Sequence, residues 1–189
     1  SLELYVFNII LIDVLATYIF SAMPYCPCAF DYLSLLESGR IKSEDFMGCQ
    51  HRVFAIVSKI ARLEELILMD HSQIRDDTIQ PQLQRRRREL EQELDSIIRT
   101  IQGDVEGLIN ANAGHDLDVA MISLIWAYGA KILFQVTLPR IASEQIGVDQ
   151  NLVNFCLEKL EALPTRLVMR TSWPYTIAGS MATSEPQHQ

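Results

Sequence analysis

Glycine and proline are scarce in this sequence, at 8 and 7 of 189 residues, and no segment alternates apolar and polar residues for long. The shortage of turn-forming residues indicates few, long elements, and the missing two-residue period argues against β-strands. Almost every apolar run instead follows a helical period. With 49% hydrophobic residues the chain can bury the core of one ordinary domain. We therefore predict an all-α fold, an irregular helical bundle of about six to seven helices.

Cysteine is also sparse, with four residues at Cys26, Cys28, Cys49 and Cys156. This number and spacing cannot form the disulfide framework of a secreted domain, so a reducing compartment is the simpler interpretation. Cys26-Pro27-Cys28 lacks a second cysteine pair, and a closed zinc site would need distant ligands. We predict that this chain holds no zinc and no other metal.

Catalytic motifs are missing as well. A di-iron bundle needs Glu-x-x-His on two helices, and only His188 in the polar tail has an acidic residue, Glu185, three positions before it. HExxH and both glycine-rich phosphate loops do not occur. Asp76-Asp77 resembles the start of the DDxxD motif of helical terpene synthases, but Gln80 stands at its fifth position. We predict no catalytic residue. The alternative that stays open is an all-α enzyme acting on isoprenoid or lipid-like substrates.

The net charge is −8 and the pI is near 5.0. An acidic domain repels phosphate backbones, so direct nucleic-acid binding is not expected. Arg85–Arg88 is the one basic run, and it fits either an import signal or, as we favour, a solvated helix face with pairs such as Arg87 with Glu91.

The segment Leu2–Phe20 is nearly long enough to span a bilayer. Glu3 and Asp13 interrupt it, and it has no basic flank. We interpret it as a buried core helix and expect no membrane association. Seven helical segments are predicted in all, with a loop at Asp70–Gln80 and a loop or frayed turn at Gly103–His115. The helices are expected at Leu2–Phe20, Asp31–Leu36, Phe46–Met69, Pro81–Ile101, Asp116–Thr137, Asp149–Leu163 and from Trp173 onward.

The segment Asp116–Thr137 is apolar nearly all round, which places it at the centre of the bundle. Trp126 should therefore be buried against the helix predicted at Phe46–Met69. Trp126, Tyr128, Phe134 and Trp173 are the candidates for either core packing or the wall of a ligand pocket.

Four segments, in order, resemble the regulatory region of fungal zinc-cluster transcription factors. The string FMGCQHRVFAIVSKIARLEEL (residues 46–66) has a Gly-Cys dipeptide opening a long helix. The others are RRRRELEQELDSI, DVAMISLIWAYGAKILFQVTL and SWPYTIAGSMA. In the last segment Ser180 stands where the family usually has cysteine.

The resemblance implies a single all-helical regulatory domain over residues 1–189, incomplete at both ends and lacking the zinc-cluster DNA-binding head. Zinc is expected only in that missing head, and no cofactor in this chain. The resemblance further implies a nuclear protein that controls transcription by binding a small hydrophobic ligand, a co-regulator or a second copy of itself.

Overall fold

The computed structural model describes residues 32–73, 79–111, 113–137 and 147–182, and it confirms the all-α fold class. This part of the chain contains seven α-helices and one 3-10 helix, and no strand. The helix predicted at Leu2–Phe20 lies outside it. The elements are α2 (Tyr32–Glu37), α3 (Ser43–Met47), α4 (His51–Gln73), α5 (Ile79–Ala111), α6 (Gly114–Thr137), α8 (Gln150–Glu161), η1 (Thr165–Thr171) and α9 (Ser172–Met181).

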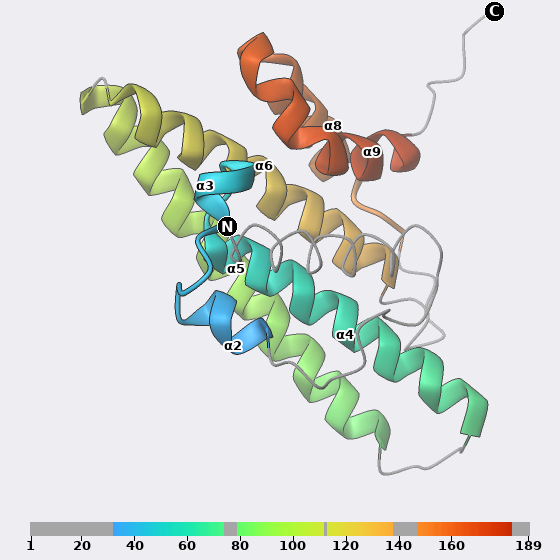
Figure 1. Ribbon diagram of the computed structural model, residues 1–189. Helices are drawn as coiled ribbons and strands as arrows, with labels where there is room; N and C mark the ends of the chain where they lie inside the picture. Colours follow the sequence, from blue (N-terminus) through green and yellow to red (C-terminus); the bar gives the residue numbers. More distant parts are fainter. Residues whose placement is uncertain (1–31, 74–78, 112, 138–146, 183–189) are drawn as a thin grey trace, which may run out of the picture.

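Helix α6 is the centre of this arrangement, as its composition predicted. It contacts α4 and α5, which lie below it in Figure 1, and α8, η1 and α9, which lie above it. Its length and hydropathy would suffice to cross a membrane, yet 72% of its most apolar window is buried within the protein. Burial by neighbouring helices accounts for the apolar character of α6.

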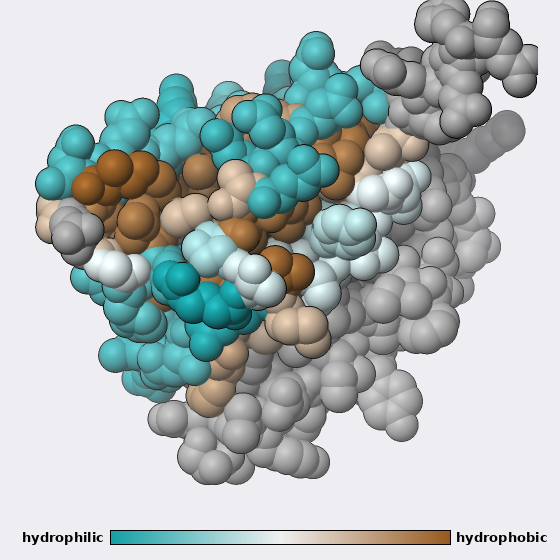
Figure 2. Space-filling view, turned by 90° about the horizontal axis from the view of Figure 1, so that it is seen from above, coloured by the Kyte–Doolittle hydropathy of each residue, from teal (hydrophilic) through white to brown (hydrophobic). Residues whose placement is uncertain are grey.

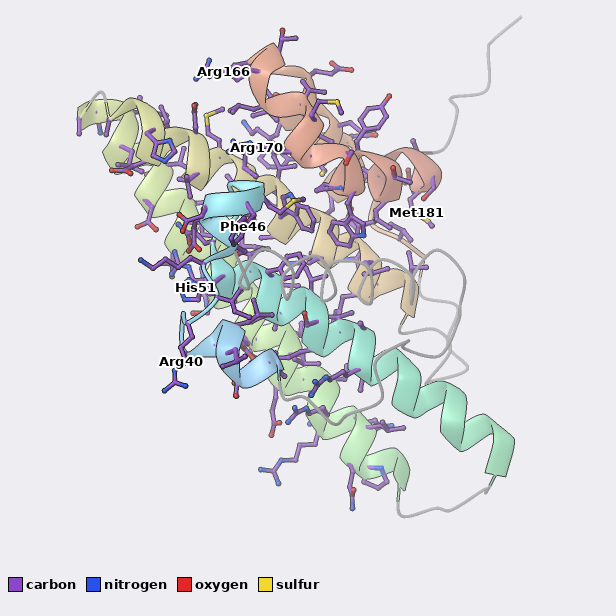
Figure 3. All side chains as sticks on the ribbon, in the orientation of Figure 1. Arg40, Phe46, His51, Arg166, Arg170 and Met181 are labelled. Atoms are coloured by element: carbon purple, nitrogen blue, oxygen red, sulfur yellow. The ribbon has the colours of Figure 1, made fainter. Side chains whose placement is uncertain are left out.

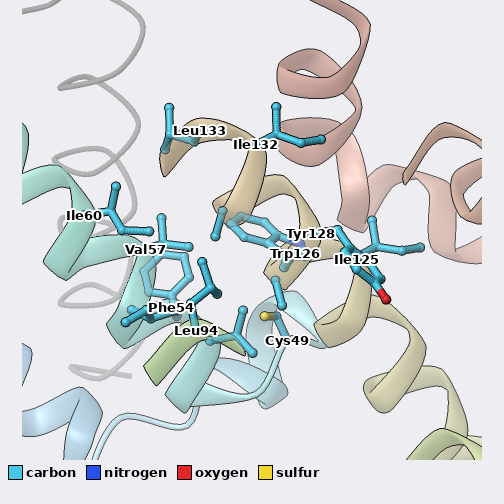
Figure 4. Close-up of a cluster of buried hydrophobic side chains, with 14 of the residues drawn as sticks. Cys49, Phe54, Val57, Ile60, Leu94, Ile125, Trp126, Tyr128, Ile132 and Leu133 are labelled. Carbon is cyan, nitrogen blue, oxygen red and sulfur yellow. The ribbon is translucent and has the colours of Figure 1, made fainter. Parts of the chain in front are cut away.

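The core lies where α4, α5 and α6 meet (Figure 4). Trp126 is fully buried, and its ring lies 5.8 Å from that of Phe54 on α4. The prediction that Trp126 packs against this helix is confirmed. Trp126 also stacks on Trp173 of α9, with ring centroids 4.8 Å apart and planes 17° apart. Trp126 therefore joins the two layers on either side of α6.

Glycine at position 129 allows α9 to approach α6 closely. A Cβ atom there would lie 3.1 Å from Pro174 Cβ and 3.2 Å from both Pro174 Cα and a Trp173 ring atom. Pro174 lies in the first turn of α9, where its missing N–H is not needed.

Two lysines connect α5 to its neighbours by ion pairs. Lys59 on α4 lies 2.8 Å from Glu37 and 2.7 Å from Glu93. Burial lowers the pKa of Lys59, but the hydrogen bonds to the two glutamates outweigh it and the net shift is upward. Lys131 on α6 lies 2.6 Å from Asp95. These pairs fix the rotation of α5 about its axis, so that its apolar stripe faces the core.

The loop predicted at Gly103–His115 is wrong, because α5 continues as one helix of 33 residues to Ala111. Gly103 and Gly107 each cost a helix interior about 1 kcal/mol relative to alanine. Ile101 is buried and Val105 packs against the core on the same stretch. Tertiary packing of the apolar stripe outweighs the cost of the two glycines.

Other boundaries also differ from those predicted. The helix expected to begin at Phe46 is two helices, because α3 ends at Met47, with Gly48 as its C-cap, and α4 begins at His51. The polar loop expected at Asp70–Gln80 is shorter, since α4 runs to Gln73 and α5 starts at Ile79. The 3-10 helix η1 was not predicted.

Asp149 caps α8 as predicted, with its carboxylate accepting a 3.0 Å hydrogen bond from the Asn151 N–H.

Candidate functional site

The Gly48-Cys49-Gln50 turn between α3 and α4 connects three helices by hydrogen bonds. Ser43 at the start of α3 donates a 2.6 Å hydrogen bond to the carbonyl of Cys49. The N–H of Gln50 donates a 2.8 Å bond to the hydroxyl of Ser123 on α6, which in turn donates to the carbonyl of Val119. This turn therefore ties the start of α4 to the middle of α6.

Gly48 is required at this turn for two reasons. Its φ angle is +71°, in the left-handed region that other residues occupy only at a cost. A Cβ atom would lie 2.7 Å from Nη1 of Arg170 and 2.9 Å from Cδ1 of Ile122. Figure 3 shows Arg170 above this junction, with Phe46 and His51 below it.

Glu44 and Arg52 are the charged residues at the junction of α3 and α4. Glu44 Oε1 accepts a 3.1 Å hydrogen bond from the backbone N–H of His51 and lies 2.8 Å from its Nδ1. A carboxylate at this end of α4 also meets the positive end of the helix dipole. Glu44 Oε2 is buried and accepts no hydrogen bond. Arg52 donates to Gln50 and, over 3.0 Å, to Asp104 of α5.

An open groove of about 960 Å³ runs from this junction between the last third of α5 and the start of α6. Its lining contains three carboxylates and one arginine, so the groove has a net charge of −2 when its histidines are neutral. The groove is lined by Glu44, Gln50, His51, Arg52, Gly103, Asp104, Gly107, Leu108, His115, Asp116 and Val119.

Helix α5 contributes glycine, and hence no side chain, at two positions of the groove. Gly103 and Gly107 are one helical turn apart and exposed, and a Cβ atom at either would meet nothing within 4 Å. The residues of this groove were not predicted as a site. The pair of glycines four residues apart was present in the sequence but was interpreted as part of a loop.

The four predicted aromatic residues lie in the packed interior and not at the groove. Trp126, Tyr128, Phe134 and Trp173 are all buried. The indole N–H of Trp126 donates a 2.9 Å hydrogen bond to the carbonyl of Arg170.

Trp126 and Trp173 stack on each other, as described above. Tyr128 instead pairs with Phe155, with ring centroids 5.0 Å apart, and its hydroxyl accepts a 2.7 Å hydrogen bond from Gln102. Burial raises the pKa of the Tyr128 phenol. The structure brings Trp126 and Trp173 together and places Tyr128 in a separate contact.

The thiols in the described part of the chain are poor nucleophiles. Cys49 is fully buried, and desolvation raises its pKa despite a hydrogen bond from Ser123 that acts the other way. Burial raises the pKa of Cys156 to about 12. His51 is engaged with Glu44, so Cys49 and His51 do not form a nucleophile and base.

Within the described ranges no group of three or more histidine, cysteine, aspartate or glutamate residues is placed to hold a metal ion. Cys26, Cys28, Asp76 and Asp77 lie outside those ranges. The arginine run is mostly exposed, and Arg85 pairs with Glu89 over 2.9 Å at the expected four-residue spacing.

Seen from above, the surface mixes hydrophilic and hydrophobic areas (Figure 2). The large hydrophobic side chains most exposed in the described ranges are Ile109, Val168, Met169 and Tyr175.

Comparison with known proteins supports the resemblance drawn from the four sequence segments. Residues 2–189 match the family model described as the fungal specific transcription factor domain. Neither a curated protein nor a solved structure matches the chain. The match spans nearly all of the chain. The chain therefore belongs to the fungal specific transcription factor domain family, the regulatory region of zinc-cluster transcription factors.

Proposed function

We propose that this domain controls transcription by binding a partner protein or a ligand, and that it does so in the nucleus without catalysing a reaction. Membership of a transcription-factor family supports the regulatory role. A co-regulator, a second copy of the chain and a small hydrophobic ligand are the occupants this proposal admits.

The observation that carries the binding role is the open groove at the α3–α4 junction. The aromatic side chains are engaged in the interior, since Trp126 contacts Phe54 and Trp173, and Tyr128 contacts Phe155. The groove, by contrast, is lined by charged side chains from four helices, α3, α4, α5 and α6. Surface recognition of a partner is therefore the mode that the described residues support best.

The absence of catalysis is also a proposal, supported by the chemistry of the described side chains. Cys49 and Cys156 have raised pKa values and remain thiols near neutral pH. The histidine nearest to Cys49 is held by Glu44. A hydrolase or transferase would need an activated nucleophile or a metal-bound water instead.

The proposal is tested by attaching residues 1–189 to the DNA-binding module of an unrelated protein in fungal cells that carry a matching reporter gene. We expect the fusion to change reporter transcription several-fold relative to the DNA-binding module alone. The matched control is the same fusion with Trp126→Ala, which should weaken the effect because loss of this buried side chain destabilises the domain. Equal transcription from the intact fusion and the module alone would contradict the proposal.

A further inference from the structure

We propose that the groove between the start of α4, the last third of α5 and the start of α6 binds a segment of a partner protein through a lysine or arginine side chain. The inference rests on the proposed function and names the chemistry of the partner. Figure 3 shows His51 at the α4 edge of this groove.

First, the side of α5 that lines the groove carries no side chain at Gly103 and Gly107. Gly103 and Gly107 weaken the helix, and neither is needed for packing, since a Cβ at either position would meet nothing within 4 Å. Gly48 and Gly129 have a structural reason, a positive φ and a close helix contact, whereas Gly179 on α9 lies in open space as Gly103 and Gly107 do. The two glycines of α5 leave the helix backbone open to solvent. A peptide backbone can approach it there more closely than any other residue type would allow.

The second step is the charge. Glu44, Asp104 and Asp116 outnumber Arg52, the one arginine in the groove lining. Arg52 is already engaged by Asp104 and Gln50. Asp116 in the first turn of α6 and Asp104 on α5 are both exposed. An ammonium or guanidinium group supplies the donors that these carboxylates can accept, whereas a phosphate or carboxylate would be repelled.

The third step distinguishes a long basic side chain from a small cation. Leu108 and Val119 are half-buried residues of the same groove and lie on its two helical walls. Lysine and arginine pack their aliphatic stems on apolar surface while the charged head reaches polar groups. The groove thus offers an apolar surface for the stem and carboxylates for the head.

The test uses the chain of residues 1–189 and two synthetic peptides, acetyl-Ala-Arg-Ala-Lys-Ala-amide and the same peptide with glutamate at both charged positions. Binding is followed by amide chemical shifts, which identify the residues affected. We expect the basic peptide to shift the amides of Gly103, Gly107 and His115, and the acidic peptide to shift none of them.

The decisive variant is Gly103→Gln with Gly107→Gln, which fills the groove from α5. Because both glycines lie in open space on a helix, this variant should melt at a higher temperature than the parent. It should nevertheless bind the basic peptide about tenfold or more weakly. Gly179→Gln is the matched control, since Gly179 is an exposed glycine of α9 with nothing within 4 Å and lies outside the groove.

Three results would overturn the inference. The first is unchanged affinity of the doubly substituted variant for the basic peptide, and the second is an equal loss of that affinity in Gly179→Gln. The third is displacement of the peptide by spermidine that binds as tightly as the peptide, which would mean that binding depends on positive charge alone. The reporter fusion separates this failure from failure of the proposed function. If the fusion with both α5 glycines replaced regulates the reporter as the parent fusion does, the groove is not the partner-binding site. If the parent fusion itself has no effect on the reporter, the regulatory role is refuted.

Discussion

Replacing Trp126 with alanine tests the packing of the whole bundle, because this side chain contacts both layers around α6. The residue is fully buried, stacks on Trp173 and contacts Phe54. Removing such a side chain typically costs about 3–5 kcal/mol. The carbonyl of Arg170 also loses its indole donor, which adds about 1 kcal/mol. The total is a large share of a domain stability of about 5–15 kcal/mol.

For a domain of this size each kcal/mol lowers the melting temperature by about 2–4 °C, so Trp126→Ala should lower it by roughly 8–24 °C. Circular dichroism of the helical signal during heating measures the change. Tyr175→Ala is the control, because this aromatic side chain is 62% exposed and its loss should change stability by about 0.5 kcal/mol or less. Trp126→Phe, which keeps a ring in the stack, should fall between the two. A Trp126→Ala chain that melts with the parent would refute the central position of α6.

The remaining predictions concern the turn, the thiols, zinc and DNA. Gly48→Ala should lower the free energy of unfolding by about 1–2 kcal/mol because of the positive φ at this position, as urea denaturation can measure. Gly107→Ala, in open space, should raise it by about 0.5–1 kcal/mol, and a loss would contradict our account of α5. Iodoacetamide at about pH 8 should leave Cys49 and Cys156 unmodified until urea unfolds the chain, as mass spectrometry of the peptides would show. Because folding raises both thiol pKa values from 9.0, unfolded thiols ionise first and stability should fall as the pH rises from 9.0 towards about 12. Elemental analysis after dialysis should find no stoichiometric zinc, and one zinc per chain would direct attention to Cys26 and Cys28. A fluorescence titration with duplex DNA at physiological salt should show only weak binding without sequence preference, and tight sequence-dependent binding would contradict this expectation.

The apolar periodicity of the sequence predicted the helices whose stripes are continuous. The helix ending at Thr137 and the cap at Asp149 were placed correctly, because each is determined by residues close in the chain. The end of α5, by contrast, was placed too early in the sequence. Gly103 and Gly107 weaken a helix locally, and only burial of Ile101 by another helix shows that the helix persists. Such packing is not visible in a local pattern.

The candidate groove could not be predicted from the sequence for a similar reason. The Gly-Cys dipeptide was recognised as a motif, but its partners Ser123 and Arg170 are distant in the chain. The 3-10 helix η1 places Arg170 over Gly48, and no spacing of residues indicates that approach. The sequence shows local chemistry such as the Glu44 carboxylate near a helix start. It does not show that α4, α5 and α6 meet at this place.

The central position of α6 has a consequence for synthesis of the protein. Phe54 on α4 and its partner Trp126 on α6 are separated by 72 positions along the chain. A ribosome that adds about 5–20 residues per second needs roughly 4–14 s to pass from one to the other. During that interval the apolar stripe of α4 has left the ribosome without the helix that covers it. Chaperones that hold exposed apolar segments should therefore associate with the nascent chain until α6 emerges, and shortening α6 should prolong that association.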